Sequence, residues 1–358
     1  LEVYKSIIND HPASALVPLA KIKLAMWHLW KRDYIAALDD VTEFMDKHPK
    51  DPLMPKAREV ALQAFAMLSA DGVSEERYAH MREIWENYPI VHMQAAELSP
   101  ESRIALGVTY WKEGKPNEAL QAIGPFFLGE KIPEYSEMAL SLALSLYLEY
   151  EQWQAIEEVA NRVDLWEIKP ETQKQLDYAL ALASENMGQS DKAVPIWQKL
   201  YESSLLSDSE KAYASFFLAR HAEKERNLEK AYTFGRESLN RLLVQVERDP
   251  GQGDLTKIKS QLGSLMDVAE TAGRLREALG FAEQYLQYLD SGDVERMAVR
   301  YRMARIYRKQ GDQERWKTIL TDLSSGNPNS VYGRIASSEL NSASLAQDAA
   351  KYSPTGRL

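Results

Sequence analysis

The chain has 358 residues, enough for two or three compact domains or one elongated one, and a formal net charge of -10 at pH 7. This acidity argues against a general nucleic-acid-binding or anionic-membrane-binding role, because both need a basic surface. There is no cysteine, which excludes disulfides, thiolate metal sites and cysteine nucleophiles, and the helix formers Ala, Leu and Glu are the commonest residues, which favours an all-helical fold.

The first predicted helix lies in the opening stretch LEVYKSIINDHP. Its Tyr4, Ile7 and Pro12 have the same relative spacing as Val41, Phe44 and Pro49, which close a helix pair farther along the chain. Leu1 therefore begins inside the second helix of a pair whose first helix is missing from this sequence. We expect the chain to be a fragment of a longer protein; the alternative is that its first helix belonged to a segment that was trimmed away, and a lipid anchor upstream of Leu1 stays open.

A repeated pattern is clearest in IALGVTYWKEGKPNEALQAIGPF, Ile104 to Phe126. Counting from Gly107 as an anchor, Tyr110 is three residues on, Gly114 seven on and Ala119 twelve on, and apolar residues follow at sixteen and nineteen. The interval of twelve recurs in seven copies, whose anchors are Ala25, Gly107, Ala143, Ala181, Ala219, Met266 and Ala304. Such recurrence indicates a repeat architecture.

The pattern predicts two amphipathic helices, A and B, joined by a tight turn. The anchor and the residue twelve on are small in most copies, so the two backbones can approach where the helices cross; Met266 and Trp316 are exceptions. Glycine seven residues on suits the left-handed conformation that ends helix A. The apolar positions at sixteen and nineteen form one face of helix B, buried against the next pair.

Some segments depart from this pattern. Residues 53 to 89 form an imperfect copy, with Arg77 or Tyr78 where alanine is wanted, but they still predict a helix pair. Interruptions at 88–102 and 248–254 are candidate hinges. After the last pair, Val331, Ile335 and Leu340 form the apolar stripe of a capping helix, and residues 341–358 are expected to be a flexible tail.

The pattern resembles the tetratricopeptide repeat (TPR) family, which shares this order of small, aromatic, Gly, Ala, apolar and Pro positions. The resemblance implies an all-α, right-handed superhelical solenoid of about eight antiparallel helix pairs over residues 1–340. Anchors here are 36 to 47 residues apart where the family has 34, so we expect a less regular superhelix.

The resemblance also implies a binding groove. In TPR solenoids, helix A lines the concave face, at positions minus six, minus three, plus one and plus four from the anchor. Projected onto this chain, those positions and their neighbours give the candidate partner-binding residues Met26, Trp30, Val108, Trp111, Leu144, Tyr147, Tyr178, Phe216, Arg220, Tyr301, Arg305 and Arg308. The early groove is then apolar and aromatic, as surfaces that anchor peptides are. The alternative is that the solenoid buries these residues internally.

The segment from Arg296 to Lys317 carries eight basic residues against two acidic ones. It is either a local site for carboxylates or a solvated face paired with Asp290, Asp293 and Glu295. The family's two-repeat clamp for a C-terminal carboxylate needs Asn directly after the anchor. The residues there are Met26, Val108, Leu144, Leu182, Arg220, Asp267 and Arg305, so we expect no such clamp.

The sequence offers no catalytic or metal-binding constellation. Six scattered histidines are never paired at a spacing of three or four, and His28 fills the aromatic position of its repeat, where a packing role is expected. The most apolar stretch, Met138 to Leu148, is about half the roughly 20 residues that a bilayer requires. We therefore expect no cofactor, no metal, no enzyme activity and no membrane span.

These observations predict a non-catalytic scaffold that binds a protein or peptide and no nucleic acid. TEFMDKHPKDP and IINDHPASALVPLAKIKLA resemble the repeats of bacterial envelope TPR proteins, which implies a periplasmic or cell-envelope location; a cytoplasmic one is the alternative. The alternative function is a sensor or regulatory domain that encloses a small ligand or controls an attached module.

Overall fold

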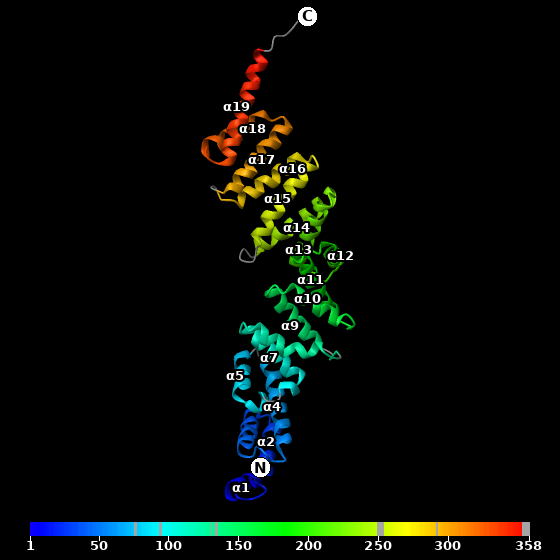
Figure 1. Cartoon of the computed structure of the whole chain (residues 1–358), viewed down its shortest axis with the longest axis vertical. Coiled ribbons are helices and arrows are strands. Elements are labelled where there is room, and N and C mark those ends of the chain that lie inside the picture. The colour runs from blue at the N-terminus through cyan, green and yellow to red at the C-terminus, as the bar shows by residue number, and fades with distance from the viewer. Residues whose placement is uncertain are drawn as a thin grey trace. The chain divides into compact units, whose positions relative to one another are not determined.

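The computed structural model describes residues 1–74, 77–92, 95–129, 131–132, 135–248, 254–290 and 293–352, and over these residues it is helical, with no strand (Figure 1). Two compact units divide the chain, residues 1–187 and residues 188–358. The expected hinges fall partly on residues 93–94 and 249–253, which lie outside the described residues.

The first unit is built from successive antiparallel helix pairs. Pairs α2–α3, α4–α5, α7–α8 and α9–α10 pack within it, and α1 packs on α2. Its elements are α1 (Glu2–Asp10), α2 (Val17–Trp30), α3 (Tyr34–Lys47), α4 (Met54–Ser74), α5 (Tyr78–Asn87), α6 (Pro89–His92), η1 (Ala95–Glu97), α7 (Pro100–Lys112), α8 (Pro116–Ile123), η2 (Gly124–Phe127), α9 (Tyr135–Glu149), α10 (Trp153–Val163) and α11 (Pro170–Asn186).

The second unit continues the same construction with pairs α13–α14, α15–α16 and α17–α18, followed by α19. Its elements are α12 (Ser190–Glu202), α13 (Asp208–Lys224), α14 (Leu228–Arg248), α15 (Leu255–Thr271), α16 (Leu275–Gln287), α17 (Val294–Gln310), α18 (Gln313–Gly326) and α19 (Val331–Tyr352). The predicted fold class, an all-α stack of antiparallel helix pairs, is confirmed, and the imperfect copy forms the pair α4–α5. We call α2, α4, α7, α9, α11, α13, α15, α17 and α19 the A helices.

The turn between helices A and B is left-handed at the seventh residue after the anchor. Glycine occupies this position with φ between 70° and 81° at Gly114, Gly188, Gly273 and Gly311. Arg32 and Arg226 take the same place in their repeats with φ of 62° and 58°. The backbone geometry of the turn is therefore kept even where glycine is not.

Small anchor residues lie at the helix crossings, as predicted. Ala25, Ala181, Ala219 and Ala304 are buried, and so is Gly107. A β-carbon added at Gly107 would lie 2.7 Å from Ile123 Cγ2 of α8 and 3.0 Å from Leu142 Cδ2 of α9. Helix α7 therefore approaches its neighbours more closely than a residue with a side chain would allow.

One predicted register is wrong by a residue. In α9–α10 the left-handed residue is Glu151, and the Gln152 amide donates to the carbonyl of Tyr147 at 2.8 Å, as the Lys115 amide does to Tyr110 in the preceding pair at 2.9 Å. The anchor of this repeat is therefore Leu144, not Ala143. Its partner twelve residues on is Ile156, which is fully buried. Large side chains take the place of small ones at this crossing, which is why a search for small residues chose the wrong register.

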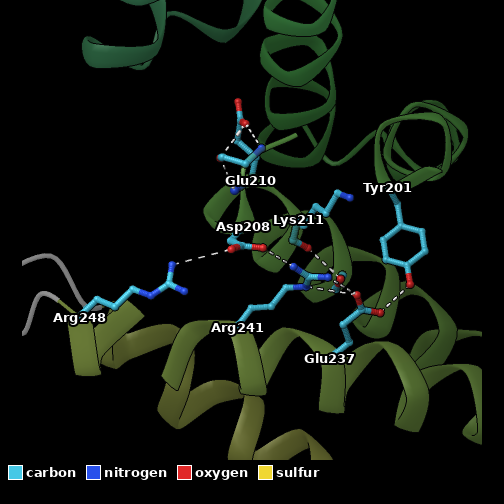
Figure 2. A network of polar contacts seen from close by, with 9 residues as sticks. Tyr201, Asp208, Glu210, Lys211, Glu237, Arg241 and Arg248 are labelled. Carbon is cyan, nitrogen blue, oxygen red and sulfur yellow. Dashed lines mark hydrogen bonds and ion pairs between the residues drawn. The ribbon is translucent and has the colours of Figure 1, made fainter. Parts of the chain in front are cut away.

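Polar contacts join three consecutive helices at the start of the second unit, as Figure 2 shows. Tyr201 of α12 donates its hydroxyl to Glu237 of α14 at 2.5 Å, and Arg241 joins Glu237 at 2.9 Å to Asp208 of α13 at 2.7 Å. Ser207 and Glu210 form a capping box that begins α13. Such partly exposed pairs fix side-chain geometry more than they stabilise the fold.

The C-terminal helix differs from expectation in two ways. Helix α19 continues past Asn341 to Tyr352, because residues 341–352 are rich in helix-forming Ala, Leu, Gln and Lys and contain no Gly or Pro. Residues 353–358 of the expected tail lie outside the described residues. The stripe that packs on the core is Tyr332, Ala336 and Leu340, with Ala336 fully buried, while Val331 and Ile335 are exposed, so the first two predicted positions are wrong by one residue.

Candidate binding groove

A cavity of about 680 Å³ opens on the A helices of the second unit. Three successive A helices line it, with one residue added from helix α16. The lining residues are Gly263, Met266, Asp267, Glu270 and Thr271 of α15, Tyr285 of α16, Glu295, Ala298, Val299, Tyr301, Arg302, Arg305 and Lys309 of α17, and Tyr332 of α19. We call this cavity the C-terminal groove.

Capping residues at both helix ends position the groove walls. Asp254 caps the start of α15, where its carboxylate accepts from the Lys257 amide at 2.9 Å, and Asp293 caps the start of α17 by accepting from the Glu295 amide at 2.9 Å. Gly311 ends α17 in the left-handed conformation. These caps fix where each helix starts and stops, and hence which side chains face each other across the groove.

Opposite charges face each other across α15 and α17. Arg302 Nε donates to Glu270 at 2.7 Å, and its guanidinium also pairs with Asp267. Lys309 Nζ lies 2.5 Å from the other oxygen of Glu270. One carboxylate of α15 therefore bridges two cations that are two turns apart on α17.

Tyrosine hydroxyls engage the remaining nearby carboxylates. Tyr285 donates to Glu295, and Tyr301 donates to Glu339 of α19. Burial and the hydrogen bond to Glu339 raise the pKa of Tyr301 to about 12, so this phenol stays a donor throughout the physiological range. The Tyr301 and Tyr332 rings lie 5.8 Å apart and form an aromatic side of the groove.

The predicted residues of the second unit divide into two groups. Tyr301 and Arg305 line the C-terminal groove, whereas Arg308 lies over the Trp316 ring at 5.0 Å and 3.8 Å from Glu339. Arg220 is exposed, with its guanidinium 5.7 Å from the Phe216 ring. Phe216 itself is 5% exposed, so we correct its assignment from a groove residue to a core residue.

In the first unit, α2 presents the most exposed of the predicted side chains. Trp30 is 73% exposed, with the Lys31 ammonium 4.6 Å from its ring centre, and Met26 is half-buried one turn earlier. Leu19 on the same helix is also exposed. The predicted apolar surface of this helix is therefore accessible in the isolated chain.

The other predicted residues of the first unit are less accessible. Val108, Trp111 and Tyr178 are half-buried, and Trp111 Nε1 donates to Glu149 of α9 at 2.7 Å. Leu144 is 2% exposed because it is the true anchor of its repeat. Tyr147 is then the packing aromatic three residues on and contacts the core. We correct Leu144 from a groove to a packing residue, whereas Tyr147 is half-buried and stays a groove prediction.

Several groove residues were missed by the sequence reasoning. Asp267 and Glu270 stand one and four residues after Met266, at template groove positions, but the projection of partner-binding residues left this repeat out. Arg302 and Lys309 lie within the basic segment. They pair with Asp267 and Glu270, and Arg300 of the same segment pairs with Asp322. The predicted partners were instead the acidic residues just before the segment. Tyr332 lies beyond the last matching repeat and gave no signal.

Among the described residues, no three or more His, Cys, Asp or Glu side chains are grouped so that they could hold a metal ion. No described helix combines the length and apolar character needed to cross a bilayer. His28, predicted to be a packing residue, is partly buried and bonds through Nδ1 to Asp40 at 2.7 Å.

No protein-family model and no curated protein sequence matches the chain. Solved structures similar to it include the apo form of RapI, with 13% identity and a TM-score of 0.44 over 86% of this chain and 87% of that one. BtubC from P. vanneervenii has 16% identity and a TM-score of 0.37 over 73% and 96%. A tetratricopeptide repeat protein from Parabacteroides merdae has 15% identity and a TM-score of 0.32 over 89% and 96%. A likeness of this degree concerns the fold alone.

Proposed function

We propose that the chain is a non-catalytic scaffold that binds a segment of another protein along its A helices. The observation that carries this proposal is the C-terminal groove, where three successive A helices converge on one cavity. Its wall combines the aromatic rings of Tyr301 and Tyr332 with charged side chains, the mixture of anchoring and orienting groups that peptide sites use. The exposed Trp30 face of α2 is a second contact surface in this proposal.

The length of the groove favours a peptide over a compact ligand. Its lining on α17 runs from Glu295 to Lys309, which corresponds to about 21 Å along a helix at 1.5 Å per residue. An extended peptide of about six residues covers that distance. A volume near 680 Å³ also lies in the range of small-molecule sites. The alternative, a regulatory domain with a small ligand, therefore predicts that no peptide motif is enriched in the experiment below.

The experiment fills the groove without disturbing the fold. Gly263 lines the groove, and a β-carbon there would meet only Tyr285 Cε1, at the ordinary distance of 3.5 Å. Gly263→Leu should therefore place a side chain in the cavity. Gly280→Leu is the matched control, since Gly280 is exposed on α16 and nothing lies within 4 Å of an added β-carbon.

Both variants and the wild type are panned against a displayed library of random 12-residue peptides. We expect the wild type and Gly280→Leu to enrich a common motif and Gly263→Leu to lose it, with unchanged helicity by circular dichroism. Peptides that bind all three proteins equally, or a library from which nothing is enriched, would overturn the proposal and favour the small-ligand alternative.

We also propose a bacterial periplasmic or cell-envelope location. Its support is the resemblance of the repeat ends, such as TEFMDKHPKDP, to those of envelope TPR proteins. Fractionation of the cells that make the protein tests it: recovery with the periplasmic or membrane fraction is expected, and recovery with the cytoplasm alone would refute it.

A further inference from the structure

The cations of the C-terminal groove outnumber the carboxylates that engage them. Arg302, Arg305 and Lys309 of α17 all line the cavity. Arg302 and Lys309 share Asp267 and Glu270 as described above. Arg305, about one turn from each, is exposed and forms no hydrogen bond or ion pair with any residue that the structure describes.

The carboxylates of the groove wall are already engaged. Asp267 and Glu270 serve Arg302 and Lys309, and Glu295 accepts the hydroxyl of Tyr285. Outside the wall, Glu339 accepts the Tyr301 hydroxyl. None of these carboxylates pairs with Arg305, so an external carboxylate can bind it without displacing one of them.

The charge of Arg305 also acts on its neighbour. Burial lowers the pKa of Arg302, and the charge of Arg305 lowers that pKa further. An anion placed at Arg305 would offset this repulsion as well as form its own charge-assisted hydrogen bonds, which are stronger than neutral ones. The chain thus holds a preformed cationic position that lacks a counter-charge.

Apolar groups lie in the same groove. Met266 of α15 and Val299 of α17 line it, and the Tyr301 and Tyr332 rings form its aromatic side. A ligand that places a carboxylate on Arg305 can therefore bury an apolar side chain in the same step. Burial of the apolar side chain contributes affinity, and the single charge fixes the position of the peptide along the groove and selects for acidic sequences.

We propose that the occupant of the C-terminal groove is an acidic peptide segment, with an Asp or Glu side chain on Arg305 and a neighbouring apolar side chain against Tyr301 and Tyr332. This inference rests on the proposed function and adds the charge of the partner. Asp267 and Glu270 are already paired with cations of α17, which weakens their attraction for a basic peptide.

The test repeats the panning with Arg305 variants. Arg305→Ala should lose the preference for acidic residues and bind the best wild-type peptide about 10-fold more weakly, the effect expected for one charge-assisted hydrogen bond. Arg305→Glu should instead enrich peptides with Lys or Arg at the same motif position. Arg276→Ala, which removes an exposed cation of α16 outside the groove, is the matched control and should leave motif and affinity unchanged.

The outcomes separate the two proposals. A motif that is lost in Gly263→Leu but shows no acidic preference, or one that Arg305→Ala and Arg305→Glu leave unchanged, overturns the inference and leaves the scaffold function standing. A motif insensitive to both Gly263→Leu and the Arg305 variants overturns both. Acidic enrichment that reverses to basic enrichment with Arg305→Glu supports the inference.

Discussion

At the scale of single residues, the left-handed turn between helices is the most repeated backbone feature of the chain. Four turns use glycine, which adopts this conformation without steric cost, whereas Arg32, Glu151 and Arg226 adopt it with a β-carbon present. For such residues the left-handed region costs roughly 1–2 kcal/mol. The repeats therefore hold local strain at three turns, and packing of the flanking helices maintains it.

This strain leads to a test by substitution. Arg226 is exposed, and Arg226→Gly should raise the free energy of unfolding of the second unit by about 1 kcal/mol, because glycine removes the steric cost. Denaturant titration followed by circular dichroism measures it. Arg226→Ala keeps the β-carbon and is the control, for which no such gain is expected; an equal gain in both variants would show that loss of the arginine, and not relief of strain, is responsible.

At the scale of elements, close approach between A and B helices depends on the anchor. Adding a methyl group at Gly107 brings it within 2.7 Å of Ile123 Cγ2, and this branched, fully buried side chain has little freedom to rotate away. Overpacking of this kind costs about 1–3 kcal/mol, while replacing a mid-helix glycine with alanine returns up to about 1 kcal/mol. The steric term is the larger one.

Gly107→Ala should therefore destabilise the first unit by about 1–2 kcal/mol, read from the midpoint of its unfolding in urea. Gly280→Ala makes the same chemical change on the open surface of α16 and should instead stabilise the second unit slightly. A stabilising effect of Gly107→Ala would mean that α7 and α8 are not in close contact at the anchor.

Periodicity was enough to predict the helix pairs, their turns and most anchors, because small residues and turn glycines mark them in the sequence. It failed at Leu144, where the crossing is filled by large side chains and carries no such mark. It also shifted the stripe of α19 by one residue, since Val331 and Ile335 are as apolar as the buried Ala336. Hydrophobicity alone does not reveal which side of a helix meets a neighbour.

At the scale of the whole molecule, the candidate site was predictable only in part. Tyr301 and Arg305 followed from their template positions, but the charge balance of the groove depends on which carboxylate of α15 reaches which cation of α17. Glu270 and Lys309 are 39 residues apart in sequence and meet only because α15 and α17 are neighbours in the stack. A single sequence contains no direct record of such pairs.

The central claim is that the A helices, and not the B helices such as α16, hold the partner. The most direct measurement is photo-crosslinking in the cells that make the protein, with a benzophenone side chain placed at Thr271, which lines the C-terminal groove, or at Glu283, exposed on α16. We predict a discrete protein adduct from position 271 that is lost when Gly263→Leu is added, and none from position 283. Adducts from position 283 alone, or from position 271 regardless of Gly263→Leu, would contradict the account.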